Sequence, residues 1–381
     1  MADFRDAVYY PAVALLEGNN PYDVAAYRDR YPAGHLFPLY SPFILLLHLP
    51  FGLLPYEIAE TVYFLWMLAM ALALAVVILQ ACDLSPTIER VLGFGALILL
   101  SRPGHWNLVN GNVAFQAALM SITALHLART RPNLAGLALG LATAKPTFGV
   151  PLGLLMLLRR DYRAVAVGIC VAIVGSVTGA AILAQAAGGW RELADTIVRD
   201  YLAAPTLPGI PNVVQDWTRI DAPAVIAHLS GEVPPTWFSG IIGLTCLASA
   251  GLYLRRLPRA GEGADGLSGT TVILATLASV FHLAYDAVLL FVPLVALLVP
   301  KRQPWPKLSP VQRTFLAALF TFPLLNYAAT NKFLTFLQIR GTARAIVCAS
   351  SGLAILTALA TCLYIGHKLA RQRETTASDS A

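Results

Sequence analysis

The sequence predicts an all-α polytopic membrane protein, a bundle of roughly ten transmembrane helices with a polar N-terminal external loop. Of its 381 residues, 57% are hydrophobic and only 13% are charged, whereas soluble domains carry about 25% charged residues. Apolar runs close to the length of about 20 residues that spans a bilayer recur along the chain. The charged residues collect in the short segments between these runs.

Three segments make up the predicted organisation. Residues 1–57 are expected to be an external loop with interfacial helices, because the apolar run 41–55 is too short to cross a bilayer and contains a proline and a glycine. Residues 58–366 are expected to form the transmembrane bundle, with one long external loop at 188–235. The hydrophilic residues 367–381 are expected to be a disordered cytoplasmic tail. Full spans are expected at 58–80 and 164–187, and further crossings at 91–101, 113–127, 134–158, 236–254, 270–285, 287–299, 315–329 and 345–365.

Positive charge predicts the orientation of the chain. Short cytoplasmic loops are enriched in Lys and Arg, so the basic loops are expected on the cytoplasmic side, namely 129–131, 159–163, 255–259, 301–307 and 367–373. This arrangement requires the apolar run 134–158 to enter the membrane and return, with Lys145 and Pro146 at its tip. The opposite face then collects the remaining polar segments, which are 1–40, 102–112, 188–235, 285–286 and 330–338. We therefore expect a multi-pass cell-membrane protein whose active site lies on the non-cytoplasmic face.

Charge and motifs exclude several classes of protein. The net charge of +6 comes from basic loops that suit the anionic cytoplasmic leaflet, and no basic face with interleaved aromatic residues indicates a nucleic-acid partner. The five cysteines stand singly in or beside apolar runs, which favours core residues over a metal site or a disulfide framework. The sequence has no nucleotide-binding glycine loop, serine nucleophile elbow or zinc-protease motif. An enzyme of the outer face without a nucleotide pocket needs an activated substrate delivered through the membrane, and a lipid-linked phosphosugar meets that need.

Two aspartates near the N-terminus are candidate general bases. Asp3 and Asp6 are three residues apart, so a helix places both carboxylates on one face. Either carboxylate can accept the proton of an acceptor hydroxyl group. The alternative is that they cap an N-terminal helix, where the helix dipole favours aspartate.

Two charged residues interrupt apolar runs. An unpaired cation at the position of Lys145 costs several kcal/mol, and a phosphate is its natural counter-ion; the alternative is a lysine that extends to the membrane interface. Asp286 stands between two apolar runs in the same way. His282, Tyr285 and Asp286 fall on one helical face, and here the alternative is a simple turn between helices.

The polar turn 102–112 offers donors and acceptors for sugar hydroxyl groups. Trp106 can stack on a pyranose face. The polar candidates are Arg102, His105, Asn107, Asn110, Asn112 and, one turn into the next helix, Gln116. The alternative is an ordinary loop whose side chains satisfy its own backbone.

Four stretches of the chain form a set that occurs in one family. The first runs from Asp3-Phe4 and Val8-Tyr9-Tyr10 through Asn20-Pro21-Tyr22-Asp23 to Tyr40 and Pro42. The others are Asn110-Gly111-Asn112-Val113, the segment Ala135 to Ala142 followed by Lys145-Pro146, and His282 with Tyr285-Asp286 and Pro293. In this order they resemble the membrane glycosyltransferases of the GT-C superfamily, and within it glycosyltransferase family 87.

The resemblance implies an inverting transferase that uses a polyprenyl-phosphate sugar as donor and an aspartate of the first external loop as base. By the Asp-Phe match that base is Asp3, with Asp6 as the next candidate, and Lys145 is expected to help hold the donor phosphate. The substrate-binding candidates are Tyr9, Tyr40, Arg102, His105, Asn110, Asn112, Gln116, Lys145, His282 and Asp286. In the family a transmembrane helix precedes this loop, so we expect the natural protein to begin upstream of Met1.

The sequence therefore predicts a hexosyltransferase that moves a hexose, in the first place mannose, to a lipid-linked or cell-envelope glycan acceptor. Its expected partners are membrane lipids, the polyprenyl-phosphate sugar and the acceptor, without a cofactor, a metal ion or nucleic acid. Two alternatives remain open at this stage. One is a flippase or transporter of lipid-linked sugars, a class that usually shows inverted repeats, and the other is an inactive, truncated homologue.

Overall fold

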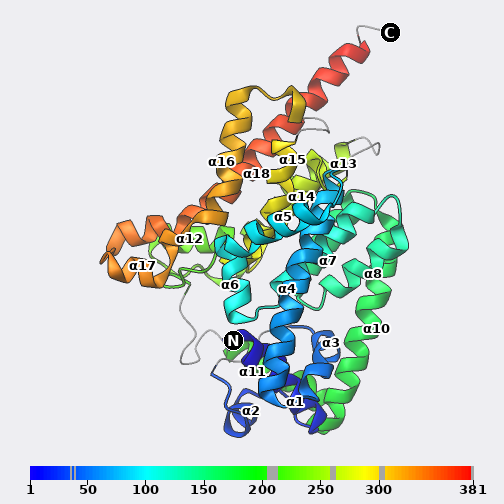
Figure 1. Ribbon diagram of the computed structural model, residues 1–381, viewed down its shortest axis with the longest axis vertical. Helices are drawn as coiled ribbons and strands as arrows, with labels where there is room; N and C mark the ends of the chain where they lie inside the picture. Colours follow the sequence, from blue (N-terminus) through cyan, green and yellow to red (C-terminus); the bar gives the residue numbers. More distant parts are fainter. Residues whose placement is uncertain (35–36, 38–39, 204–212, 258–262, 300–304, 379–381) are drawn as a thin grey trace.

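The computed structural model describes the whole chain except residues 35–36, 38–39, 204–212, 258–262, 300–304 and 379–381. The described residues form helices, joined by short connections (Figure 1). The N-terminal half contains η1 (Phe4–Tyr9), α1 (Tyr10–Leu16), α2 (Val24–Arg30), α3 (Phe43–Gly52), α4 (Tyr56–Ala81), α5 (Ile88–Leu100), α6 (Arg102–Asn110), α7 (Ala114–Leu127), α8 (Pro132–Ala142), α9 (Pro146–Leu158) and α10 (Tyr162–Ala187). The C-terminal half contains α11 (Trp190–Ala203), α12 (Ala222–Ser230), α13 (Thr236–Arg256), α14 (Leu267–Ser279), η3 (Ala284–Leu290), α15 (Phe291–Leu298), η4 (Trp305–Lys307), α16 (Pro310–Leu325), η5 (Tyr327–Ala329), α17 (Asn331–Phe336) and α18 (Gly341–Ser378).

Four of the described helices are long and apolar enough to cross a membrane. They are α4, α10, α13 and residues Gly341–Leu369 of α18, and each coincides with one of the predicted crossings; α4 and α10 were predicted as full spans. The shorter apolar runs form α3, α7, α8, α9, α14 and the stretch Ala284–Leu298. The all-helical membrane class is thus confirmed, while the number of about ten crossings stays a prediction.

The N-terminal segment packs onto the bundle through an aromatic cluster. The Phe4 ring stacks on Tyr63 of α4 at 4.6 Å between centroids, and the Tyr9 hydroxyl donates to the Leu54 carbonyl at 3.0 Å. At Gly52 of α3, a Cβ would lie only 3.0 Å from Ala12 of α1, so the two helices approach closely. This packing holds η1, and with it Asp3, against the bundle.

Small residues bring α8 and α10 into close contact. A Cβ on Gly136 or Gly140 would lie 2.5 Å from Val167 or Val171, and one on Gly168 would lie 2.8 Å from Leu139. Glycines four residues apart form the spacing that lets helix backbones approach in membranes. This contact fixes the end of α8, from which Lys145 projects.

The apolar run 134–158 is divided as the sequence predicts. α8 ends at Ala142, and α9 begins at Pro146 and packs back on α8. The helical structure is interrupted over Thr143–Lys145. A residue before proline is restricted to extended conformations, and Lys145 has φ −105° and ψ 95°. The break therefore lies at the Lys145-Pro146 step.

Three segments expected to be irregular are helical. The predicted turn 102–112 is α6, because the Ser101 side chain caps its N-terminus by accepting from Gly104 N and Gly111, at φ 71°, ends it. The predicted loop 188–235 contains α11 and α12, and Asp221 caps the latter. The tail expected to be disordered continues α18 as far as Ser378, and residues 379–381 lie outside the described residues.

Two contacts, at opposite ends of the molecule, join polar segments that are far apart in the sequence. At one end the backbone N–H of Val24 in α2 donates to Asp200 of α11 at 2.9 Å, and both helices lie beside the N-terminus in Figure 1. At the other end Arg160 donates to the Arg255 carbonyl at 2.9 Å, which joins two of the basic loops. Which end faces the cytoplasm stays a prediction.

Candidate active site

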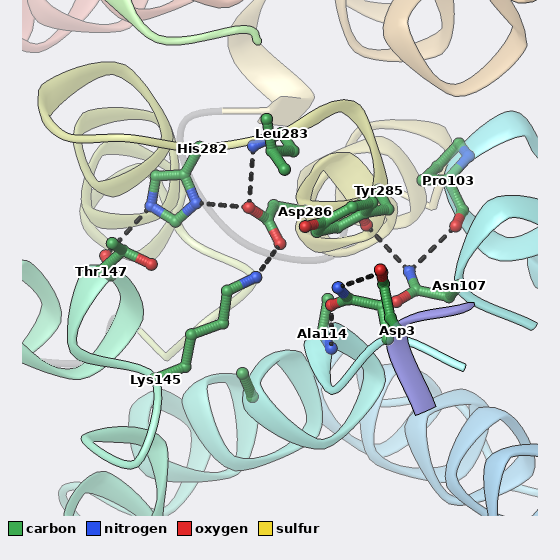
Figure 2. Close-up of polar contacts among 12 residues, drawn as sticks. Asp3, Pro103, Asn107, Ala114, Lys145, Thr147, His282, Leu283, Tyr285 and Asp286 are labelled. Atoms are coloured by element: carbon green, nitrogen blue, oxygen red, sulfur yellow. Dashed lines mark hydrogen bonds and ion pairs between the residues drawn. The ribbon is translucent and has the colours of Figure 1, made fainter. Parts of the chain in front are cut away.

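A buried ion pair forms the centre of the candidate site. Lys145 Nζ lies 2.6 Å from Asp286 Oδ1, and the two side chains are 7% and 1% exposed (Figure 2). The second oxygen, Oδ2, accepts from the Leu283 N–H at 2.9 Å and lies 2.9 Å from His282 Nδ1. All three interactions fix the Asp286 carboxylate, so each of the two intramembrane charges found in the sequence has the other as its partner.

His282 lies between two hydrogen-bond acceptors. Its Nδ1 faces the Asp286 carboxylate, and its Nε2 lies 3.0 Å from the Thr147 carbonyl oxygen. Both partners are acceptors, and each ring nitrogen lies within hydrogen-bond distance of one of them. Lys145 is the cation that pairs with the Asp286 carboxylate in this geometry.

Two aromatic rings surround the Lys145 ammonium. Its Nζ lies 4.8 Å from the centroid of Phe148 and 4.9 Å from that of Tyr285. Such cation–π contacts add roughly 0.5–2 kcal/mol each, depending on solvation. Of its three N–H donors, one is taken by Asp286, so the ammonium keeps donors for a further oxygen ligand.

Local backbone geometry brings His282 and Asp286 to the same side. Residues 282–283 are extended and pair antiparallel with the segment 218–220, where Ala284 N donates to the Thr218 carbonyl at 2.7 Å and Ile220 N to the His282 carbonyl at 3.0 Å. The 3₁₀ helix η3 then begins at Ala284. The i, i+4 pairing expected of His282 and Asp286 is therefore present, although the first of them precedes the helix.

Asp3 reaches the same cluster from the N-terminal segment. Its Oδ2 accepts from Asn112 Nδ2 at 2.8 Å, and Asn112 Oδ1 accepts from the Ala114 N–H at 2.9 Å (Figure 2). The Asn112 side chain also interacts with the hydroxyl groups of Tyr40 and Tyr285. Burial, followed by the negative charge of Asp3, raises the pKa of Tyr40 well above its ordinary value. The tyrosine is therefore a neutral phenol that can donate a hydrogen bond.

Asp6 has a different environment from Asp3. Its carboxylate is 1% exposed and accepts from Arg5 Nε at 2.7 Å, Arg5 Nη2 at 3.2 Å and the Gly34 N–H at 3.2 Å. Asp3 is partly exposed and borders the Lys145–Asp286 pair (Figure 2). Only Asp3 has the access that a base needs.

The other predicted site residues have contacts away from this cluster. The Tyr9 hydroxyl donates to Leu54, and Gln116 Oε1 lies 3.2 Å from His48 Nε2. Arg102 is buried and donates to the Ala329 carbonyl at 2.7 Å. His105 is exposed on α6, and Asn110 is the last residue of that helix. The structure thus brings together Asp3, Tyr40, Asn112, Lys145, His282 and Asp286. It gives Asp6, Tyr9, Arg102 and Gln116 other partners, while His105 and Asn110 lie on α6.

Two contributions to the cluster are less visible in the sequence. Asn107 Nδ2 donates to the carbonyls of Pro103 at 2.9 Å and Tyr285 at 3.0 Å, which fastens α6 to η3. Because Asn107 lies in a polar stretch, the sequence predicted a contact with a sugar and not this structural role. The Thr147 carbonyl is a backbone group, so no residue type could reveal it.

Metal ligation has no support in the described part of the chain. No group of three or more His, Cys, Asp and Glu side chains there could hold a metal ion. The Asp286 oxygens are occupied by protein donors.

The fold and the site define a helical membrane protein with a buried, charged cluster beside an accessible carboxylate. The family model for glycosyltransferase family 87 matches residues 38–282. This is more than half of the chain, so the protein belongs to glycosyltransferase family 87 and is a glycosyltransferase. The family resemblance read from the sequence is confirmed. No curated protein and no solved structure matches the chain. The matched range contains Tyr40, Asn112, Lys145 and His282.

Proposed function

We propose that the protein transfers a hexose, mannose in the first instance, from a polyprenyl-phosphate sugar to a lipid-linked or cell-envelope glycan acceptor, with inversion at the anomeric carbon. The observation that carries this proposal is the position of Asp3. This partly exposed carboxylate borders a buried cluster in which Lys145 supplies positive charge (Figure 2). A base and a phosphate-binding cation beside each other are what such a reaction requires.

Asp3 serves as the base in this proposal. One of its oxygens accepts from Asn112 at 2.8 Å, which orients the carboxylate. The acceptor O–H gives its proton to Asp3 while its oxygen attacks the anomeric carbon. The bond between that carbon and the phosphate oxygen breaks, and polyprenyl phosphate leaves.

Lys145 stabilises the leaving phosphate. Charge develops on the phosphate oxygen as the glycosidic bond breaks, and a preorganised cation lowers the energy of that state. Asp286 and the Phe148 and Tyr285 rings hold the ammonium in place, so it does not have to reorganise during the reaction. Tyr40 and Asn112 are suited to donate to sugar hydroxyl groups at the same site.

The site is proposed to face the non-cytoplasmic side of the membrane. The N-terminal segment contacts α11, whereas the basic loops around Arg160 and Arg255 contact each other. The positive-inside rule places those basic loops in the cytoplasm. A donor carried on a polyprenyl lipid is available on the opposite side without a soluble nucleotide.

Transfer from polyprenyl-phosphate mannose tests the proposal. The full chain is reconstituted in lipid nanodiscs with radiolabelled donor and a membrane glycolipid extract, and lipid-linked product is measured. Asp3→Asn is expected to lower the rate by about 10²–10⁴-fold, the usual contribution of a general base. Asp6→Asn is the matched comparison, because its carboxylate serves Arg5 and Gly34, and it should retain most of the rate. Undiminished transfer by Asp3→Asn would refute the base assignment, and translocation of labelled lipid without covalent transfer would support the flippase alternative.

A further inference from the structure

A polar cavity lies outside the Lys145 cluster. It has a volume of about 820 Å³ and lies between the segment around Trp217, the C-terminal end of α12, and the starts of α17 and α18. The residues that give it its chemistry are Gln215, Trp217, His228, Asn331, Thr342 and Arg344. Figure 1 shows α12, α17 and the start of α18 on the same side of the molecule. None of these residues takes part in the chemistry described above.

Two positive charges, those of Arg344 and Arg102, lie in and behind this cavity without an ion-pair partner among the described residues. The guanidinium of Arg344 forms neither an ion pair nor a side-chain hydrogen bond within the described residues. Arg102 lies behind the wall, 5.9 Å from the Trp217 ring, and its buried Nε has no partner in the structure. Burial lowers the pKa of Arg102 to about 10, so it remains charged at neutral pH. Gly341 and Thr342, in the first turn of α18, add the positive end of a helix dipole.

Few negative charges oppose these two arginines. The Asp216 carboxylate interacts electrostatically with His228 and Cys348, two residues that line the cavity. Its Oδ1 accepts from the Thr218 N–H at 3.0 Å and from the Thr218 hydroxyl group, so it is held in its own loop. Two cations and one anion leave a net positive cavity that suits an anionic ligand.

His228 offers an unused hydrogen-bond acceptor to the cavity. The residue is 2% exposed, its Nδ1 lies 3.2 Å from the Val214 carbonyl, and its Nε2 has no partner in the structure. Burial lowers the pKa of His228, so the ring is neutral at pH 7. Because a carbonyl only accepts, Nδ1 carries the proton and Nε2 is left as an acceptor. A ligand hydroxyl group is the natural donor to it.

Aromatic and apolar residues complete the recognition of a lipid-linked sugar. Trp217 presents a ring of the kind that stacks on pyranose faces, and it is itself fixed by a contact of 4.7 Å between ring centroids with Trp106. Large apolar side chains stand exposed on the adjoining helices, with Leu229 of α12 at 53% and Phe336 of α17 at 82% exposure. A lipid chain attached to a sugar in the cavity could lie along this apolar rim.

The cavity is joined to the candidate active site by one short stretch of backbone. Trp217 immediately precedes Thr218, whose carbonyl accepts from Ala284, and Arg219 bridges Leu283. Two residues of extended chain span roughly 7 Å. Trp217 therefore lies a short distance from the backbone pairing that holds the segment with His282 and Asp286. The Asp221 carboxylate strengthens this link by accepting from the His282 N–H at 3.3 Å.

We propose that this cavity binds the anionic saccharide head of a lipid-linked acceptor, while the donor occupies the Lys145 cluster. The proposal rests on the proposed function and adds a second substrate site with its own chemistry. Arg344 and the start of α18 hold the anionic group, Trp217 stacks on the sugar, and His228 Nε2 accepts from a sugar hydroxyl.

Binding of mannose 6-phosphate to the full chain tests this assignment without requiring activity. The chain is placed in phosphatidylcholine nanodiscs, and the dissociation constant is measured by isothermal titration calorimetry. Arg344→Gln should weaken binding by tenfold or more, as expected for loss of a charge-assisted hydrogen bond. Arg340→Gln is the matched control, because that arginine is exposed one turn earlier and does not line the cavity. His228→Asn keeps a donor near the Val214 carbonyl and removes the Nε2 acceptor, and it should weaken binding as well.

Each other outcome has a defined meaning. Binding that is absent in the wild type, or unchanged in Arg344→Gln, overturns the proposal. Inorganic phosphate binding as tightly as mannose 6-phosphate would reduce the cavity to an anion site and refute saccharide recognition. Displacement of mannose 6-phosphate by a short-chain polyprenyl-phosphate mannose would make the cavity the donor site and overturn the acceptor assignment. If the wild type binds the probe but transfers no hexose, the proposed function fails and the cavity remains; if it transfers hexose but does not bind the probe, only the cavity assignment fails.

Discussion

Breaking the Lys145–Asp286 pair should destabilise the protein strongly. The two charged groups are 2.6 Å apart and their side chains are almost fully buried, at 7% and 1% exposure. Two unit charges about 4 Å apart in an effective dielectric of about 20 attract by about 4 kcal/mol. Removing one partner of such a pair costs about 3–5 kcal/mol, because the other charge is left uncompensated.

The two single substitutions should differ in size. In Lys145→Met, the Asp286 carboxylate keeps the Leu283 N–H and His282 as partners, so we expect about 3 kcal/mol, the lower end of that range. In Asp286→Asn, the buried Lys145 ammonium loses its carboxylate partner, and His282 and the Leu283 N–H lose theirs as well, so we expect about 5 kcal/mol, the upper end. The double variant should be more stable than the sum of the singles predicts, by about 3 kcal/mol, as for directly coupled residues.

Unfolding by SDS in mixed micelles, followed by circular dichroism, measures these differences. Lys368→Met is the control, since this lysine is exposed near the end of α18 and its loss should change stability by less than about 0.5 kcal/mol. A cost below about 1 kcal/mol for Lys145→Met would show that the ammonium is not buried against Asp286. Additive single costs in the double variant would also contradict the pairing.

Three further predictions concern packing, the helix α6 and pH. Gly136→Ile should destabilise the α8–α10 contact by about 1–3 kcal/mol through overpacking, whereas Gly153→Ala should be tolerated, because its Cβ would meet Leu139 at an ordinary 3.8 Å; SDS unfolding compares the two. Asn107→Leu removes the hydrogen bonds to Pro103 and Tyr285 and should cost about 1–3 kcal/mol in the same assay, because buried carbonyls lose their donor. Burial lowers the pKa of His228, so the folded protein binds this proton less readily than the unfolded chain, and thermal stability should fall as the pH drops below about 6.5, a dependence that His228→Asn should reduce. A transition temperature that rises between pH 7 and 5 in the wild type but not in His228→Asn would contradict this sign.

Apolar length predicted the spans well, and polar composition misled the interpretation of short helices. The run 58–80 became α4 because a membrane-length apolar stretch satisfies its backbone only as a helix. The stretch 102–112 contains as many polar side chains as a turn, yet Ser101 and Gly111 supply a cap and a stop for α6. For short helices with polar side chains, capping residues were therefore better evidence of a helix than polar composition was of a turn.

The sequence singled out the residues that meet in the candidate site, together with others that have different partners, but it did not predict their contacts. Lys145 and Asp286 each attract attention because charges within apolar runs are costly. Their mutual pairing depends on the α8–α9 break facing η3, which is a tertiary contact between residues 141 positions apart. The sequence does not distinguish Asp3 from Asp6 as a candidate base. In the folded protein Asn112 donates to Asp3 and Arg5 donates to Asp6, and these different partners distinguish the two residues.

The two charged regions of this protein differ in how far their groups are satisfied, and that difference bears on their roles. Buried polar groups in folded proteins almost always have partners, and the Asp286 carboxylate accepts from three protein donors. Such a group is suited to hold a geometry, here that of Lys145. The cavity near α18 instead contains the His228 Nε2 atom, and the Arg102 Nε atom lies behind its wall; neither has a hydrogen-bond partner among the described residues. Groups left unsatisfied at this cost are suited to receive a ligand, so binding and chemistry are expected to occupy separate regions joined through the segment 217–220.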